Sequence, residues 1–204
     1  MAQIRLTQTA LKQQKDQLKT FRRFLPTLLV KKQLLQRELL ACRARIEALE
    51  ERVRQLWLEL DEWVGLFAEE IGLDQLVQIE SIETDLEPVA GLELPRFKGL
   101  TLKTIPYDLY KTPLWTERGI DALQRLASIE AEVSLEFEAE ELIAHELRIT
   151  GQRVNLFEKV KIPQTQENIR RIRTHLDDQA VAAVGWARGA KKKLAQRPLV
   201  KGVL

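Results

Sequence analysis

The stretch LLQRELLACRARIEALEERVRQLWLEL, residues 34–60, repeats apolar side chains at alternating steps of three and four residues. This spacing places an apolar stripe along one side of a helix, and a stripe sustained over several heptads is typical of a coiled coil. The stripe extends outward over residues 4–67, where sixteen of nineteen positions are apolar. These positions are Ile4, Thr7, Leu11, Gln14, Leu18, Phe21, Leu25, Leu28, Lys32, Leu35, Leu39, Cys42, Ile46, Leu49, Val53, Leu56, Leu60, Trp63 and Phe67. The three polar positions are Thr7, Gln14 and Lys32, so we expect looser packing in the first half of the helix.

Pro26 lies inside this pattern. A proline in a helix interior removes a backbone donor and its ring clashes with the preceding turn, at a cost of about 3 kcal/mol. We therefore predict a long helix within residues 1–75, with a kink or a short break near Pro26.

The pattern changes after about Gly72. The segment VQIESIETDLEPVAGLELPRFKGLTLKTIPYDLY, residues 77–110, contains three prolines and two glycines. Within it, LEPVAGLELP predicts a strand, a turn and a returning strand. We expect a β-hairpin or irregular protrusion over residues 76–104, inside a connecting segment that ends at residue 112. It should lean on other parts of the chain, because an isolated hairpin is marginally stable in water.

Helical spacing resumes in KTPLWTERGIDALQRL, residues 111–126. Thr112 is a candidate N-cap with Pro113 in the first helical position, which is a favoured start. We predict a second helix over residues 113–197, with a kink near Pro163, and a flexible tail over 198–204. Its expected stripe contains Leu123, Leu126, Ile129, Val133 and Phe137, and later Ile162, Thr165, Ile169, Ile172, Leu176, Gln179, Ala183, Trp186 and Ala190.

Two long helices with apolar stripes, separated by a short middle segment, predict an antiparallel pair. The expected fold class is all-α dominated: a long antiparallel two-helix coiled-coil hairpin with a small β-hairpin protrusion in the middle of the chain. A protein of this kind is suited to connecting distant sites.

The composition indicates a soluble, cytoplasmic protein. Hydrophobic residues make up 45% of the 204 residues, which is too apolar for disorder. The one cysteine, Cys42, cannot form a disulfide within the chain, and its position in the stripe predicts a buried side chain. No signal-peptide core is visible, and the longest apolar runs fall short of the roughly 20 residues that span a bilayer.

Charge is distributed unevenly along the chain. Residues 1–37 carry a net charge of +8 and residues 179–204 a net charge of +6, whereas residues 38–160 carry −13. If the chain folds back once, the two basic ends meet at one tip. A basic tip fits an acidic protein partner, a nucleic acid or an anionic membrane surface.

Residue patterns that carry catalysis are not visible. The glycines are scattered and form no phosphate-binding loop, and His145 and His175 are far apart on charged helical stretches. The glutamates of residues 130–141 lie on several sides of a helix, which predicts a solvated face. We therefore expect no catalytic, cofactor-binding or metal-binding residues.

The segment RVNLFEKVKIPQTQENIRRI, residues 153–172, resembles the signature of the D subunits of the rotary V/A-type ATPases and ATP synthases. In that family an Arg-Val-Asn triplet is followed by an Ile-Pro pair within a long C-terminal helix. Three further segments are similar to elements of the family in the same order. The first helix resembles the opening helix of the family, VAGLELPRF resembles its mid-chain hairpin, and YDLYKTPLW resembles the start of its second helix. The sequence departs from it at Pro26 and in VKKQLLQ. The matching motif residues are Arg153, Val154, Asn155, Ile162 and Pro163.

The resemblance implies a non-catalytic central rotor shaft that couples ATP hydrolysis or synthesis to proton or sodium-ion transport. It implies no cofactor and no membrane insertion. The implied partners are the catalytic and regulatory A and B subunits, the small F subunit of the stalk and the C/d subunit of the funnel. A nucleic-acid-binding protein and a homodimeric structural coiled coil are the alternatives.

Two surfaces are candidates for contacts in such a complex. The charge map predicts rotor–stator contacts at Lys12, Lys15, Lys19, Arg22, Arg23, Lys191, Lys192 and Lys193. A partner-binding or regulatory hairpin is expected around Val89, Gly91, Leu92, Leu94 and Pro95.

Overall fold

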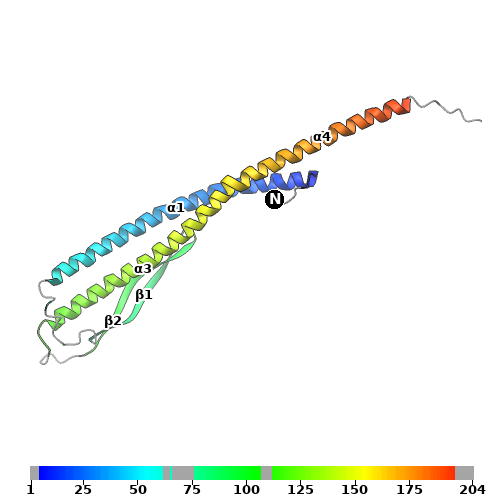
Figure 1. The fold of residues 1–204 in the computed structure, drawn as a ribbon. Coiled ribbons are helices and arrows are strands. Elements are labelled where there is room, and N and C mark those ends of the chain that lie inside the picture. Colours follow the sequence, from blue (N-terminus) through cyan, green and yellow to red (C-terminus); the bar gives the residue numbers. More distant parts are fainter. Residues whose placement is uncertain (1–4, 62–64, 66–75, 107–111, 196–204) are drawn as a thin grey trace, which may run out of the picture. The chain divides into compact units, whose positions relative to one another are not determined.

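The computed structural model describes residues 5–61, 65, 76–106 and 112–195. The predicted fold class is confirmed, because helices dominate and one small antiparallel sheet lies in the middle of the chain (Figure 1). The predicted tail, 198–204, and the stripe positions Ile4, Trp63 and Phe67 lie outside the described residues. The elements are α1 (Gln8–Asp61), β1 (Val77–Val89), β2 (Leu92–Thr104), α3 (Thr116–Asn155), η2 (Leu156–Lys161) and α4 (Ile162–Ala195).

The chain divides into two compact units. The first unit, which we call the terminal unit, contains residues 1–29 and 152–204. The second, the hairpin unit, contains residues 30–151. Both ends of the chain therefore belong to the same unit, and α1 contributes residues to each.

The predicted stripe is the buried face of α1. Every stripe position from Leu11 to Leu60 is buried or half-buried. Thr7 is different: it is exposed and caps the helix, since the N–H of Ala10 donates to Thr7 Oγ1 at 3.2 Å. The helix continues through Pro26, so the alternative of a short break is excluded, while a kink stays a prediction.

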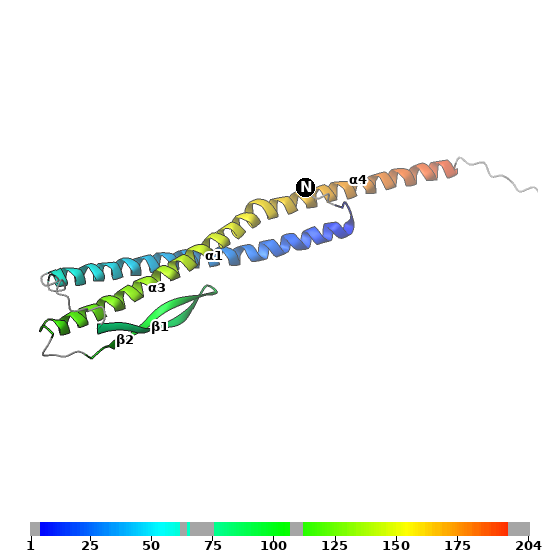
Figure 2. The ribbon, with the colours of Figure 1, turned by 60° about the horizontal axis from the view of Figure 1, so that its bottom comes forward.

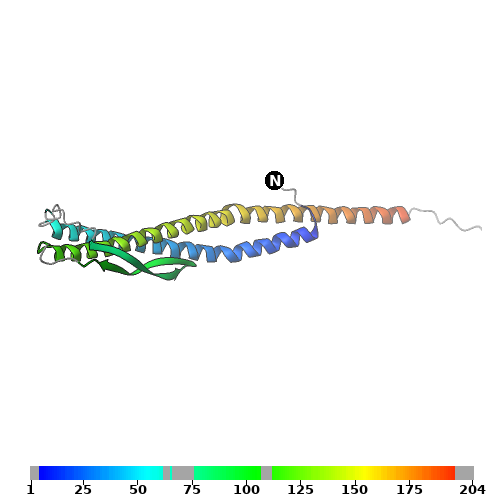
Figure 3. The same ribbon diagram turned by 90° about the horizontal axis from the view of Figure 1, so that it is seen from below.

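In the hairpin unit, α1 and α3 lie side by side in antiparallel orientation (Figure 3). Ion pairs join Lys31 to Glu146 at 2.6 Å and Arg43 to Glu140 at 2.7 Å, so rising numbers on α1 meet falling numbers on α3. The main core consists of Leu35, Cys42 and Ile46 from α1, Leu94 from β2, and Ala139 and Ile143 from α3. A smaller cluster contains Leu56, Leu60 and Ala122.

The β-hairpin leans on the helices as expected, since Leu94 is completely buried in this core. β1 and β2 pair antiparallel, with Val89 opposite Leu92. The two residues between them, Ala90 and Gly91, have φ angles of 50° and 81°. Positive φ at both central residues matches the tight turn that best suits the twist of a hairpin.

Two predictions about α3 are wrong in detail. The helix begins at Thr116, not Pro113, because Thr116 donates from both its N–H and its hydroxyl to the Pro113 carbonyl, forming a turn before the helix. Phe137 was expected in the buried stripe but is 47% exposed. The buried face passes instead through Glu136, Ala139 and Ile143.

In the terminal unit, the first turns of α1 lie along η2 and α4 (Figure 2). Leu11 packs with Ile169 and Ile172, and Asn168 Nδ2 donates to Gln14 Oε1 at 3.2 Å. Farther along α1, the ring of Phe21 stacks on Phe157 with 5.3 Å between centroids. The helices are therefore paired antiparallel in this unit as well.

Candidate functional site

The predicted contact residues on α1 are all at the surface. Lys12, Lys15, Lys19, Arg22 and Arg23 are exposed, and three of them line an open groove of about 400 Å³ between α1 and α4. Its other lining residues are Leu18, Gln166, Ile169 and Arg173. The groove therefore has a basic rim and an aliphatic floor, a surface that suits acidic and apolar groups together.

The C-terminal part of α4 has no partner among the described residues. Leu176 is the last half-buried residue, and every residue from Asp177 to Ala195 is exposed. The predicted stripe therefore ends at Leu176, and its extension to Gln179, Ala183, Trp186 and Ala190 is wrong, because α4 continues past the start of α1 (Figure 2). Apolar side chains nevertheless persist there: Val181 is 73% exposed and Trp186 is 78% exposed.

Lys191, Lys192 and Lys193 lie in this exposed segment. They share a unit with the basic residues of α1, as a single folding back of the chain requires. They lie beyond the part of α4 that packs on Leu11, so within the described chain they are not covered by α1. The segment combines apolar and cationic side chains on a helix with no described intramolecular partner, which is the composition of a surface that another protein covers.

The motif residues surround a widened helical turn. The six residues of η2 form a π-helix, and the N–H of Ile162 donates to the carbonyl of Phe157, five residues earlier. Pro163 follows at once; it has no N–H, and its ring would clash with a normal α-helical turn. The wider turn makes room for the ring, so the helix continues without a break. π-helical turns and prolines both cause kinks, and the predicted kink near Pro163 stays a prediction.

The five motif residues are divided between the buried and the exposed faces of the helix. Val154 is buried and Ile162 half-buried, whereas Arg153, Asn155 and Pro163 are exposed. After the proline, the Thr165 hydroxyl donates to the Lys161 carbonyl at 2.7 Å, which satisfies an acceptor next to the widened turn. The buried members hold the helix pair together, and the exposed members are accessible to other groups.

A hydrogen-bonded network fastens the β-hairpin to both helices. Arg96 on β2 donates to Glu38 on α1 at 2.9 Å, to Glu136 on α3 at 2.6 Å and to Glu87 on β1 at 2.7 Å. Arg45 on α1 also bonds Glu38 and Glu136. One guanidinium therefore links three other elements, and a second one neutralises the same carboxylates.

The network changes the proton affinities of its members. Burial and the hydrogen bond to Glu136 raise the pKa of Cys42 to about 11. Burial alone would lower the pKa of Arg96, but its hydrogen bonds to Glu87, Glu136 and Glu38 outweigh this and raise it. At neutral pH Cys42 is thus a protonated thiol and Arg96 a fixed cation.

The sequence reasoning missed this network. Glu136 was placed on a solvated face, but it is only 7% exposed. Counting back from Val154 in alternating steps of four and three residues reaches Thr150, Leu147, Ile143, Glu140 and Glu136. This spacing places Glu136 on the same helical face as the buried Val154, and it could have predicted from the sequence that Glu136 is buried.

Of the predicted hairpin residues, Leu94 lies in the core, while Val89 and Leu92 pack against that core. Gly91 is exposed at the turn and Pro95 is half-buried opposite Leu86. Leu94 is inaccessible to another protein, so a partner role of the hairpin would have to use its exposed residues.

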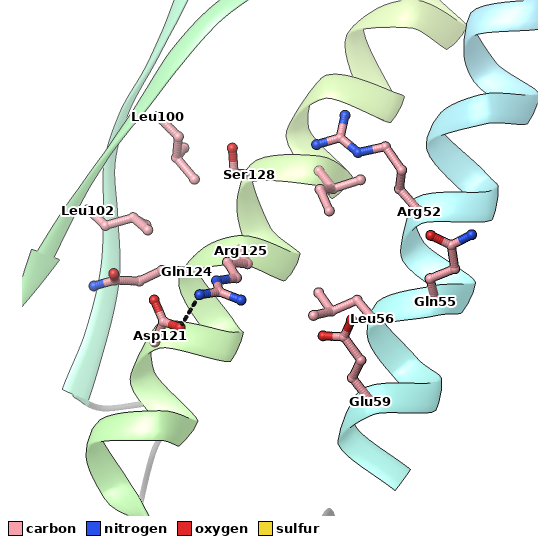
Figure 4. Close-up of a pocket in the computed structure, with 11 residues that line it drawn as sticks. Arg52, Gln55, Leu56, Glu59, Leu100, Leu102, Asp121, Gln124, Arg125 and Ser128 are labelled. Atoms are coloured by element: carbon pink, nitrogen blue, oxygen red, sulfur yellow. Dashed lines mark ion pairs between the residues drawn. The ribbon is translucent and has the colours of Figure 1, made fainter.

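Near the other end of the hairpin, a cleft of about 540 Å³ opens between α1, α3 and β2 (Figure 4). Leu100 and Leu102 of β2 point toward the helices, where Leu56 and Ile129 complete an apolar floor. Its rim is polar and carries the ion pair between Arg125 and Asp121 at 2.9 Å. Neither this cleft nor any other part of the described chain contains a cluster of three metal-ligating side chains.

No helix among the described residues has the length and hydropathy required to cross a membrane.

Comparisons with known proteins agree over nearly the whole chain. The family model for the ATP synthase D subunit matches residues 10–192. The V-type ATP synthase D subunit of Borreliella burgdorferi is 36% identical over 197 residues, covering 97% of this chain and 98% of that protein. The V-type ATP synthase D subunit of Chlamydia muridarum is 34% identical over 200 residues, covering 96% and 98%. That of Chlamydia pneumoniae is 31% identical over 198 residues, covering 96% and 95%.

Proposed function

The chain belongs to the family of ATP synthase D subunits, and from this premise we propose that it turns as the central rotor shaft of a V-type ATP synthase. It is a central-stalk subunit of a rotary ATPase and is part of a multi-subunit complex. In this proposal the shaft couples ATP hydrolysis or synthesis in a catalytic hexamer to proton or sodium-ion transport through a membrane ring.

The observation that carries the proposal is the exposed segment 177–195 of α4, in the same unit as the basic residues of α1. Its apolar side chains and its three consecutive lysines would be covered inside the hexamer of A and B subunits. The lysines and the basic rim of α1 would contact acidic groups of the stator, which favours correct orientation more than it adds affinity.

The shaft itself carries no catalytic group in this proposal. The subunits around it bind the nucleotides, and each rotor angle favours one nucleotide state over another at the surrounding interfaces. The hairpin unit would lie nearer the membrane, where its proposed partners are the small F subunit of the stalk and the C/d subunit of the funnel. The complex would face the cytoplasm, with this shaft peripheral to the membrane.

The direct test is assembly with the other subunits. Affinity purification of the full chain from its own cell, followed by mass spectrometry, should recover the large ATP-binding subunits in fixed stoichiometry. A variant that ends at Leu176 should lose most of this recovery, while hydrogen exchange in α1, α3 and the hairpin stays as slow as in the full chain. Recovery of a self-dimer alone would refute the rotor assignment, as would salt-dependent DNA binding without the ATPase subunits.

The comparisons do not support the nucleic-acid-binding or homodimeric alternatives.

A further inference from the structure

The strand β1 is an exposed edge. Every residue from Gln78 to Pro88 is exposed, and in the described part of the chain β1 pairs only with β2. The backbone N–H and C=O groups on its outer side therefore lack a strand partner. The pairing of β1 with β2 shifts register between Ile79 and Ser81 and between Glu83 and Thr84, so the regular stretches between these points are the parts of the edge on which another strand can pair.

Two aliphatic residues of β1 pair with the β2 residues that line the cleft shown in Figure 4. Ile79 lies opposite Leu102, and Ile82 lies opposite Leu100, the two β2 residues that line the cleft. Directly paired residues share one face of a sheet, so the apolar surface runs from the cleft onto the edge strand. Ile79 is 59% exposed and Ile82 is 46% exposed.

The charge of β1 has one sign. The strand contains Glu80, Glu83, Asp85 and Glu87, and no lysine or arginine. Glu87 is neutralised by Arg96, whereas neither Glu80 nor Glu83 forms an ion pair with another described residue. Acidic residues alone would suffice to guard an edge against self-association. They do not account for the exposed isoleucines, whose burial would be favourable.

We propose that β1 and the adjoining cleft bind an extended segment of a partner protein in which lysine or arginine alternates with aliphatic residues. The segment pairs with the free edge of β1, its aliphatic side chains cover Ile79 and Ile82, and its cations meet Glu80 and Glu83. A second copy of this chain does not fit, because two β1 strands would bring like charges together. The inference rests on the proposed function only for the identity of the complex that supplies the partner.

The first experiment uses the isolated full chain and a synthetic ten-residue peptide of alternating lysine and valine. The peptide should slow the hydrogen exchange of residues 77–89, and the double variant Glu80→Lys/Glu83→Lys should weaken its binding about tenfold. The matched variant Glu138→Lys/Glu141→Lys makes the same change of charge at exposed positions on α3 and should bind normally. An alternating glutamate–valine peptide should not bind.

Equal weakening by both double variants would mean that the peptide senses only net charge, and this would overturn the proposal. Protection confined to residues outside both β1 and the adjoining cleft, or no binding at all, would overturn it as well.

The second experiment asks which segment occupies the edge in the purified ATPase. Ser81 is exposed on β1 and has no part in the proposed recognition, so Ser81→Cys places a reactive thiol on the strand while the buried Cys42 stays protected, and a thiol-linked photo-cross-linker reports on the edge alone. The cross-linked peptide should contain alternating cationic and aliphatic residues. A cross-link to a helical or acidic segment would refute the strand proposal in a complex whose assembly still supports the rotor function. Failure of the complex to form would refute the rotor function, and the peptide experiment would still decide about β1.

Discussion

Arg96 Nη1 donates a hydrogen bond of 2.6 Å to Glu136 Oε1, and this contact joins the β-hairpin to α3. Glu136 is 7% exposed, so its charge depends on Arg96 and Arg45 for compensation. Removing one member of a buried ion pair is strongly destabilising, because the remaining charge stays away from water without a counter-ion. The network therefore fixes the position of the hairpin and makes that position sensitive to single substitutions.

Glu136→Gln should lower the free energy of unfolding by about 3 kcal/mol. Glutamine keeps the size of the side chain but removes the charge that faces Arg45 and Arg96. Urea unfolding followed by circular dichroism measures the effect. Glu138→Gln, on the exposed face of the same helix, should change the stability by less than about 0.5 kcal/mol. Equal effects of the two substitutions would show that the network does not stabilise the fold.

Cys42 gives a second measure of the same core. Its pKa is raised to about 11 from an ordinary value of 9.0, so at pH 8 the thiolate fraction is roughly 100-fold lower than in an unfolded chain. Iodoacetamide should therefore modify the native protein at least about 100-fold more slowly than the urea-unfolded protein. Mass spectrometry follows the reaction without ambiguity because the chain has one cysteine. Equal rates in the two states would contradict the buried site.

The same shift predicts how stability depends on pH. Below pH 9 the thiol is protonated in both states, and its contribution to stability is complete. As the pH rises from 9 toward 11, the unfolded chain releases the proton first, so the native state should lose stability. Cys42→Ala should be less stable overall but should lack this part of the alkaline loss. An alkaline loss of the same size in the variant would assign it to other groups.

The fold could be predicted from the sequence because the stripe on α1 is regular. Its three-and-four spacing is maintained from Leu11 to Leu60, and the buried face follows it residue by residue. The stripe on α3 was harder to place, because Glu136, Glu140 and Thr150 occupy buried or half-buried positions that reasoning from hydropathy assigns to solvent. What makes Glu136 an interior residue is Arg96, forty residues away in the chain, and a helical pattern contains no information about a cross-element partner.

The candidate site could likewise be predicted only where it does not depend on contacts between elements. Basic residues could be assigned to the surface from their type alone, but the end of the stripe at Leu176 depends on where α1 begins. The widened turn before Pro163 could not be predicted from the sequence either. A kink, a break and a π-helical turn are three different ways for a helix to accommodate a proline that lacks an N–H, and the sequence does not distinguish them.

Pro163→Ala tests the role of that widened turn. Alanine restores the N–H and favours a regular α-helix, so the variant should be more stable, by less than the roughly 3 kcal/mol that a proline costs in a plain helix interior. The gain is smaller because η2 already relieves the clash. If the turn gives the rotor its eccentric shape, ATP-driven ion transport should fall while assembly is retained. A straightened helix with unchanged coupling would show that the proline has no mechanical role.

Neutralising Lys191, Lys192 and Lys193 to glutamine tests the electrostatic contact between rotor and stator. All three are exposed on the segment of α4 that has no described intramolecular partner, so the triple variant should fold normally. Three surface ion pairs of about 0.2–1 kcal/mol each would together weaken binding to the hexamer about tenfold and reduce its salt dependence. The measurement is hexamer affinity as a function of ionic strength, with coupled ion transport as a second readout. The control changes Lys98, Lys103 and Arg118 to glutamine, which removes the same charge from exposed positions of the hairpin unit. Long-range attraction depends on the net charge of the protein, whereas local ion pairing depends on the positions of the charges. An equal loss of hexamer affinity in both triple variants would therefore show that the three lysines of α4 have no specific electrostatic role.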